Sequence, residues 1–227
     1  MQHLVLVHGA VGSPTQLKPL ADLLSDKFRV HTPGFRGHGG IPGPDAFSFD
    51  GFTEDIEEFL AEKKIEKCLL FGYSMGGYAA LKFAAIHPEK VSGIITLATK
   101  FEWTPEIAAK ETAMLNPAVI EEKVPGFAAA LENLHAPLDW KEQLSYTKDL
   151  LMSLGKNNRL TLADHKEITT PCLLMLGDRD KMVTLGETVD VYTALPAGAM
   201  AVLPQTPHPI EKIDLQLLRF HIEQFLR

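Results

Sequence analysis

Six short apolar runs constrain this chain more than any other feature. They are too short for buried helices, and several are bounded by glycine or proline. Most are apolar at successive positions, which is typical of strands covered by helices on both faces of a parallel sheet. The predicted strands are HLVLVH (3–8), FRVHT (28–32), KCLLFG (67–72), SGIITLA (92–98), CLLMLG (172–177) and AMAVLP (199–204).

Stretches with helical signals separate most of these runs. Ser13 followed by Pro14 is typical of a helix start, and Pro88 ends a later helical pattern. Strands that alternate with helices predict an α/β fold, a doubly wound and mostly parallel sheet of about six strands with helices on both faces. The helices are expected within 13–26, 48–64, 75–88, 185–196 and 214–227.

Residues 100–165 interrupt this alternation, because they hold several helix-like segments and no convincing strand. One crossover helix is expected at such a place in a parallel sheet. The other helix-like segments predict a helical lid insertion over the carboxyl ends of the strands, where such sheets bind ligands. The domain prediction is therefore an α/β core of residues 1–99 and 166–227 with a lid at 100–165.

Composition narrows the classes of partner. The net charge is −7 and no basic cluster stands out, so nucleic acid is a poor candidate. No apolar run approaches the length of a membrane span, and the start MQHLVLVHG lacks the basic segment of a signal peptide. Cys68 and Cys172 lie in apolar runs and are expected to be buried free thiols. We expect a cytoplasmic protein without a membrane or nucleic-acid partner, either monomer or dimer.

The segment GYSMG places a serine where a predicted strand turns into a predicted helix. This is the arrangement that a nucleophile elbow requires. Gly72 and Gly76 leave room beside Ser74 in an unfavourable backbone conformation. The start of the helix that follows offers free N–H groups to a developing oxyanion. Ser74 is therefore the candidate nucleophile.

A nucleophilic serine needs a base and an acid that orients the base. His208 follows the last strand among three prolines and is the candidate base. Asp180, Asp178 and Glu102 each lie near the carboxyl end of a strand and compete for the place of the acid.

The other histidines have weaker contexts. His8 and His38 lie in loops, where structural hydrogen bonding is expected for His8 and a place at the cleft for His38. His87 precedes Pro88 at a helix end, and the histidines at 3, 31, 135, 165 and 221 have no comparable context.

The segments HGAVGS, RGHGG, GYSMGGYAAL, HPEKVSGIITLA, PCLLMLGDRDKMV and PHPIEKID resemble, in this order, those of the α/β-hydrolase superfamily. The resemblance covers most of the chain and points to small lidded serine hydrolases of the carboxylesterase and menaquinone-pathway lyase branch. It implies the chain order Ser, Asp, His. The family spacing Gly-x-x-Asp selects Asp180 from Gly177, although a less common variant places the acid near Glu102.

The resemblance also implies an oxyanion hole and departs from the family at one point. The backbone N–H groups of Ala10 and Met75 are the expected donors, with Val11 as the rival of Ala10. The family usually has two antiparallel strands before the HLVLVHG strand, and these are expected to be absent here.

The predicted activity is hydrolysis of a small-to-medium carboxylic ester or thioester through an acyl-enzyme. No cofactor is implied, and no cluster of ligand residues has metal spacing. Phe101 and Trp103, which follow the fourth strand, are the expected substrate contacts. One alternative is a carbon–carbon bond lyase or hydrolase, although the arginine typical of that branch is replaced here by GGYAAL. Another is a slow-turnover ligand receptor on the same scaffold.

Overall fold

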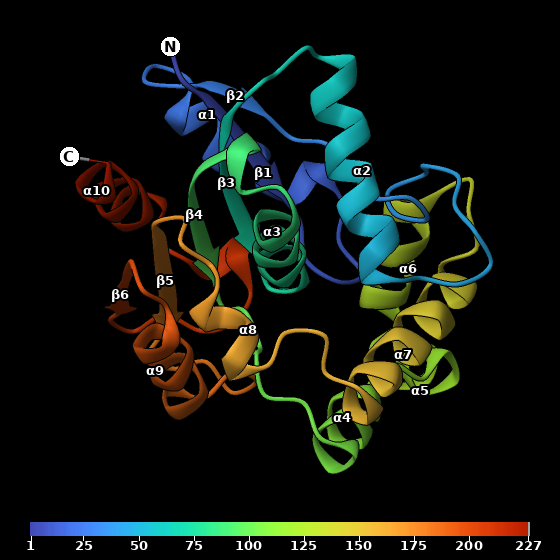
Figure 1. Ribbon diagram of the computed structural model, residues 1–227. Helices are drawn as coiled ribbons and strands as arrows, with labels where there is room; N and C mark the ends of the chain where they lie inside the picture. Colours follow the sequence, from blue (N-terminus) through green and yellow to red (C-terminus); the bar gives the residue numbers. More distant parts are fainter. Residues whose placement is uncertain (227) are drawn as a thin grey trace.

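The computed structural model describes residues 1–226 and has a six-stranded parallel sheet at its centre, in the order β2-β1-β3-β4-β5-β6 (Figure 1). The predicted fold class is confirmed, and each expected strand is found to within one residue at either end. The strands are β1 (His3–Val7), β2 (Arg29–His31), β3 (Cys68–Tyr73), β4 (Val91–Leu97), β5 (Cys172–Gly177) and β6 (Gly198–Leu203).

Alternate residues of the strands contribute to two separate cores, one on each face of the sheet. Val5 and Val7 of β1 join the core that includes α2 and α3, whereas Leu4 and Leu6 join the core that includes α1 and α10. All four side chains are at most 1% exposed. This two-sided burial explains why the strands are apolar at successive positions.

Helices with clear capping residues cover the sheet. Ser13 caps a short 3-10 turn before α1, Ser48 caps α2, and Asp214 caps α10. Thr184 begins α9 with a capping box. Arg227, the last residue of the predicted C-terminal helix, lies outside the described residues. The bounds are α1 (Lys18–Leu24), α2 (Phe49–Glu62), α3 (Met75–Ile86), α9 (Leu185–Ala194) and α10 (Leu215–Phe225).

Five further helices lie between β4 and β5. The first four pack on one another, away from the sheet (Figure 1), whereas the last packs against α9. Prolines occupy the first position of three of them, where the missing N–H costs no hydrogen bond. The division into core and lid stays a prediction. The helices are α4 (Pro105–Thr112), α5 (Pro117–Lys123), α6 (Pro125–His135), α7 (Trp140–Lys156) and α8 (Leu162–Lys166).

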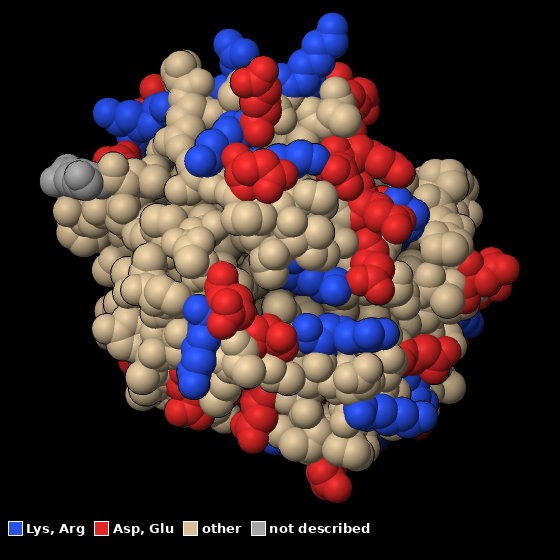
Figure 2. Space-filling view, in the orientation of Figure 1, with Lys and Arg blue, Asp and Glu red and all other residues tan. Residues whose placement is uncertain are grey.

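Acidic and basic side chains are interspersed over the face of the molecule seen in Figure 2. Cys68 and Cys172 are buried free thiols, as expected, and burial raises the pKa of each to about 12. Among residues 1–226, none of the helices combines the length and the hydrophobicity that a membrane crossing needs.

Candidate active site

Ser74 lies at the sharp turn between β3 and α3. Its φ of 52° and ψ of −117° are unfavourable for a residue with a side chain. The turn is held because the Ser74 N–H donates to the Leu97 carbonyl (2.8 Å) and Thr99 Oγ1 donates to the Ser74 carbonyl (3.0 Å). A Cβ on Gly76 would lie 2.6 Å from the His8 carbonyl oxygen, so only glycine fits beside β1. The Ser74 hydroxyl has no hydrogen-bond partner among the described residues.

His208 and Asp180 are brought together after β6 and β5. His208 Nδ1 lies 2.7 Å from Asp180 Oδ2, and the Asp180 side chain is only 1% exposed. Asp180 Oδ1 accepts hydrogen bonds from the N–H groups of Met182 (2.8 Å) and Val183 (3.0 Å). Burial acts to raise the pKa of Asp180, but His208 and these two N–H groups outweigh it and lower the pKa. The structure therefore pairs His208 with a carboxylate that is held in one orientation.

The competing acids lie elsewhere. Asp178 is exposed, and its Oδ1 accepts a hydrogen bond from the Thr206 N–H (3.1 Å), so it ties the loop after β5 to the loop after β6. Glu102 is also exposed, and its backbone N–H donates to Glu187. Among the three acids, only Asp180 contacts His208 in the described residues.

The turn Gly9–Gly12 follows β1 and carries the predicted oxyanion donor. The Gly12 N–H donates to the Gly9 carbonyl (3.2 Å), which also accepts from His8 Nδ1 (2.9 Å). The N–H groups of Ala10 and Met75 have no acceptor among residues 1–226, and both residues line the same cavity as Ser74. These donors are therefore free to bind an oxygen atom in that cavity.

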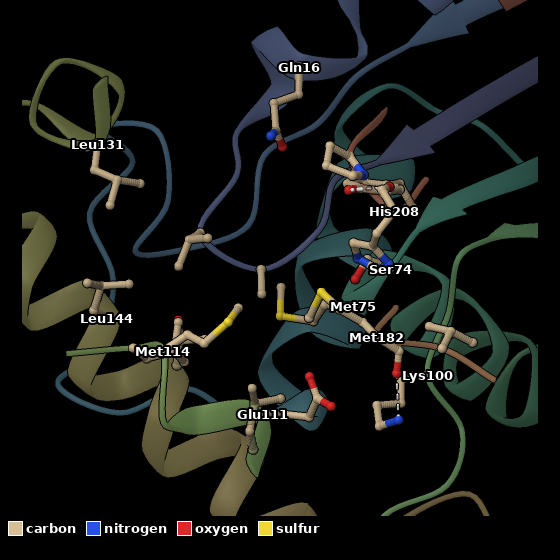
Figure 3. A pocket seen from close by; sticks show the side chains of 18 of the residues that line it. Gln16, Ser74, Met75, Lys100, Glu111, Met114, Leu131, Leu144, Met182 and His208 are labelled. Carbon is tan, nitrogen blue, oxygen red and sulfur yellow. Dashed lines mark hydrogen bonds between the residues drawn. The ribbon is translucent and has the colours of Figure 1, made fainter. Parts of the chain in front are cut away.

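A cavity of about 810 Å³ joins these groups to the helices α4–α7. Ser74 and His208 lie side by side at one end of it, and Leu131 and Leu144 lie at the other (Figure 3). Of the two expected substrate contacts, Trp103 lines the cavity and Phe101 does not. Phe101 is 4% exposed because it packs in the core cluster that includes residues of α3, with its ring edge-on to His165 of α8.

Charged side chains at the cavity were not anticipated from the sequence, because their partners are distant in the chain. Lys100 Nζ donates to the Met182 carbonyl (2.8 Å) and lies 3.5 Å from the buried Glu187 carboxylate. Its positive charge is therefore already partnered. Glu111 and Glu211 also line the cavity, and Figure 3 shows the Glu111 carboxylate directed into it.

Two further histidines are buried near the turn Gly9–Gly12 and are neutral. His8 Nε2 accepts a hydrogen bond from the Phe35 N–H (3.2 Å), and burial lowers the pKa of His8 to about 4. His38 stacks on Phe47 and is fully buried, which lowers its pKa to about 3. His38 is not part of the cavity lining, contrary to the expected place at the cleft. Within residues 1–226, no three potential metal ligands gather into a cluster.

Known proteins resemble this chain in sequence and in fold. A family model described as alpha/beta hydrolase fold matches residues 2–150. A protein of Bacillus subtilis (strain 168) with the provisional name 2-succinyl-6-hydroxy-2,4-cyclohexadiene-1-carboxylate synthase is 26% identical, over 98% of this chain and 89% of its own length. The pimeloyl-[acyl-carrier protein] methyl ester esterase of Aeromonas hydrophila is also 26% identical, over 90% of this chain and 87% of its own. A solved structure from work on carboxylesterases of Nitrososphaera gargenis superimposes with a TM-score of 0.80 at 20% identity, and the match covers 99% of this chain and 89% of the other.

Proposed function

Because this chain belongs to the alpha/beta hydrolase fold family, we propose that it is a serine hydrolase that cleaves a carboxylic ester or thioester. One observation carries the proposal. The His208–Asp180 pair and the strained Ser74 meet at one end of a single cavity, in the chain order that serves acyl transfer in this fold.

The proposed reaction begins when Ser74 Oγ attacks the substrate carbonyl and His208 takes its proton. Asp180 holds the His208 proton on Nδ1, which leaves Nε2 free to act as the base. The N–H groups of Ala10 and Met75 bind the oxyanion as it forms. The alcohol or thiol leaves with the proton from His208, and water then attacks the acyl-enzyme to release the acid and regenerate Ser74.

The cavity supports an acyl group that is apolar and uncharged. Leu131 and Leu144 lie at its far end, and Met114 reaches in beside α4 (Figure 3). The other side chains of α5–α7 that line the cavity are mostly apolar. Lys100 is partnered by Glu187, whereas Glu111 and Glu211 add negative charge. A carboxylate on the acyl chain would be desolvated there without a cation, which costs several kcal/mol.

Two kinds of experiment test the proposal. A fluorophosphonate should label Ser74 and no other serine, and Ser74→Ala should lose labelling and most ester turnover while it folds normally. Ser153→Ala, at an exposed serine on α7, is the matched control and should keep both. Labelling at another serine, or an active Ser74→Ala variant, would end the serine-hydrolase proposal.

The substrate class is tested with matched esters. The kcat/KM for p-nitrophenyl octanoate should exceed that for the mono-p-nitrophenyl ester of suberic acid, which has the same length and a terminal carboxylate, by about tenfold or more. The methyl p-nitrophenyl diester of suberic acid is the uncharged control and should restore the rate. Equal rates for the charged and uncharged esters would refute the assignment of an uncharged acyl group.

A synthase reaction on the same scaffold, in place of ester hydrolysis, is the second candidate, and one observation favours it. The Bacillus subtilis relative named as a synthase matches 98% of this chain. The assay is direct, because the purified protein either forms the compound in that name from its precursor or does not. If the protein turns over that precursor and is inactive on every ester and acyl-CoA thioester, the hydrolase proposal is wrong and the synthase reaction takes its place.

A further inference from the structure

A buried histidine outside the candidate triad joins the inserted helices to the turn Gly9–Gly12. His135 is the last residue of α6 and is fully buried. Its Nδ1 lies 3.1 Å from the backbone nitrogen of Gly39, and its Nε2 lies 3.2 Å from the carbonyl oxygen of Val11. His135 therefore connects three segments that are far apart in the sequence.

The partners of His135 fix its tautomer. The Gly39 N–H can only donate, so Nδ1 must accept and carries no proton. The proton then lies on Nε2 and is donated to the Val11 carbonyl. Burial lowers the pKa of His135, which agrees with a neutral ring that both donates and accepts.

The carbonyl that His135 binds belongs to a strained turn. Val11 has a φ of 51°, in the left-handed region that a β-branched side chain disfavours. Such a conformation persists only where the surroundings hold it. His8 holds the Gly9 carbonyl at one end of the turn, and His135 holds the Val11 carbonyl at the other. Ala10, whose N–H is free, lies between these two fixed points.

We infer that His135 is a positioning residue that keeps the Ala10 N–H directed at the reacting carbonyl, an inference that rests on the proposed function. The loop around Gly39, which donates to His135, packs closely against Ser13 on one side and against Ala136, the residue after α6, on the other. A Cβ on Gly39 would lie 2.7 Å from Ser13 Cβ, and a Cβ on Gly40 would lie 2.6 Å from the Ala136 carbonyl. Leu131 and Leu134 of the same helix line the cavity, so α6 borders the proposed acyl site and also contacts the turn Gly9–Gly12.

Kinetics of His135→Ala and His135→Gln test this role. A misdirected oxyanion donor should lower kcat on p-nitrophenyl butyrate by about 10–100-fold with KM nearly unchanged. Affinity for a trifluoromethyl ketone, which forms a tetrahedral adduct with serine, should fall in proportion. Affinity for the matching methyl ketone should not. His135→Gln retains an acceptor and a donor and should recover part of the loss.

His165→Ala is the matched control. His165 on α8 is also a buried histidine, 1% exposed, and its Nδ1 lies 2.7 Å from the carbonyl of Thr161, the residue that caps this helix. None of its hydrogen bonds in the described residues reaches the turn Gly9–Gly12. This variant should lower Tm while kcat at permissive temperature stays unchanged. If His135→Ala lowers only Tm in the same way and keeps kcat and the affinity for the trifluoromethyl ketone, His135 is structural and the inference is wrong.

Amide hydrogen exchange provides a readout that does not depend on ester turnover. In His135→Ala, which loses both hydrogen bonds of the ring, the Gly12 amide should exchange at least about tenfold faster than in the wild type, whereas the amides of α3 should not change. An unprotected Gly12 amide in the wild type, or equal protection in the variant, would overturn the inference. Wild-type protein that resists fluorophosphonate and hydrolyses no ester would end the proposed function, and the exchange result would still decide whether His135 holds the turn.

Discussion

Replacing Asp180 by asparagine tests the candidate acid without changing its shape. Two backbone donors, the N–H groups of Met182 and Val183, face the position of Oδ1. An asparagine must therefore place its carbonyl oxygen there, and its NH₂ group is directed at His208 Nδ1. A donor at that position forces Nδ1 to accept, so the His208 proton moves to Nε2, the atom that should take the proton of Ser74.

The expected loss is large because the tautomer is wrong rather than merely less favourable. A comparable exchange in a serine triad lowers kcat by about 10⁴-fold, equivalent to about 5.4 kcal/mol of transition-state stabilisation. The fold should persist, because the amide is isosteric and both backbone donors stay satisfied. We would measure kcat on p-nitrophenyl butyrate, with circular dichroism and Tm to show that the variant is folded.

Two matched variants serve as controls. Asp178→Asn keeps an oxygen for the Thr206 N–H and should retain near-full activity. Glu102→Gln changes an exposed side chain and should do the same. The reasoning is refuted if Asp180→Asn retains more than about a tenth of the wild-type kcat, or if either control loses as much as Asp180→Asn.

Three further predictions follow from local geometry. Gly76→Ala should prevent stable folding, because its Cβ would lie 2.6 Å from the His8 carbonyl oxygen. A Cβ on Gly126 would meet no atom within 4 Å, so Gly126→Ala should raise the free energy of unfolding, measured by urea titration, by about 0.4–1 kcal/mol. The pKa values of His8 (about 4) and His38 (about 3) lie below the ordinary value of 6.5, so the unfolded chain binds more protons below pH 6.5. The free energy of unfolding should then fall by about 2–3 kcal/mol per pH unit near pH 5, and a flat profile from pH 7 to 5 would contradict this. Trp103→Leu should change the ratio of kcat/KM for octanoate and butyrate esters by about tenfold or more. The substitution removes no hydrogen bond, because Trp103 Nε1 has no partner among the described residues. An unchanged ratio would show that Trp103 is not part of the acyl pocket.

The sheet could be predicted from the sequence because its signal is local. Most of the strands are apolar at successive positions, and glycines or prolines near the ends of several of them help to limit their length. The short helix α5 was not predicted, because PAVIEEK is only seven residues long and joins the neighbouring helical patterns. The helix α8, five residues long, carries too few positions for a periodicity.

The candidate site was predictable only where sequence order determines position. Ser74, Asp180 and His208 each follow a strand, and the carboxyl ends of parallel strands meet at one edge. Whether a side chain after a strand end lines the cavity or enters the core depends on packing, so Phe101 and Trp103 had the same prediction and occupy different places. The Lys100–Glu187 pair depends on contacts between distant segments, and no local pattern indicates such contacts.

The contact between His135 and Val11 has a consequence for protein engineering. Exchange of the whole segment between β4 and β5 is an attractive way to change the substrate range, since the candidate nucleophile, base and acid all lie outside it. This segment, however, also supplies a hydrogen-bond donor to the turn after β1. A chimera that joins foreign helices to this scaffold would keep all three of those residues and still lose that donor. The donated segment should therefore place a histidine against the Val11 carbonyl, or the graft should be extended to include the loops around Val11 and Gly39 as one recombination block.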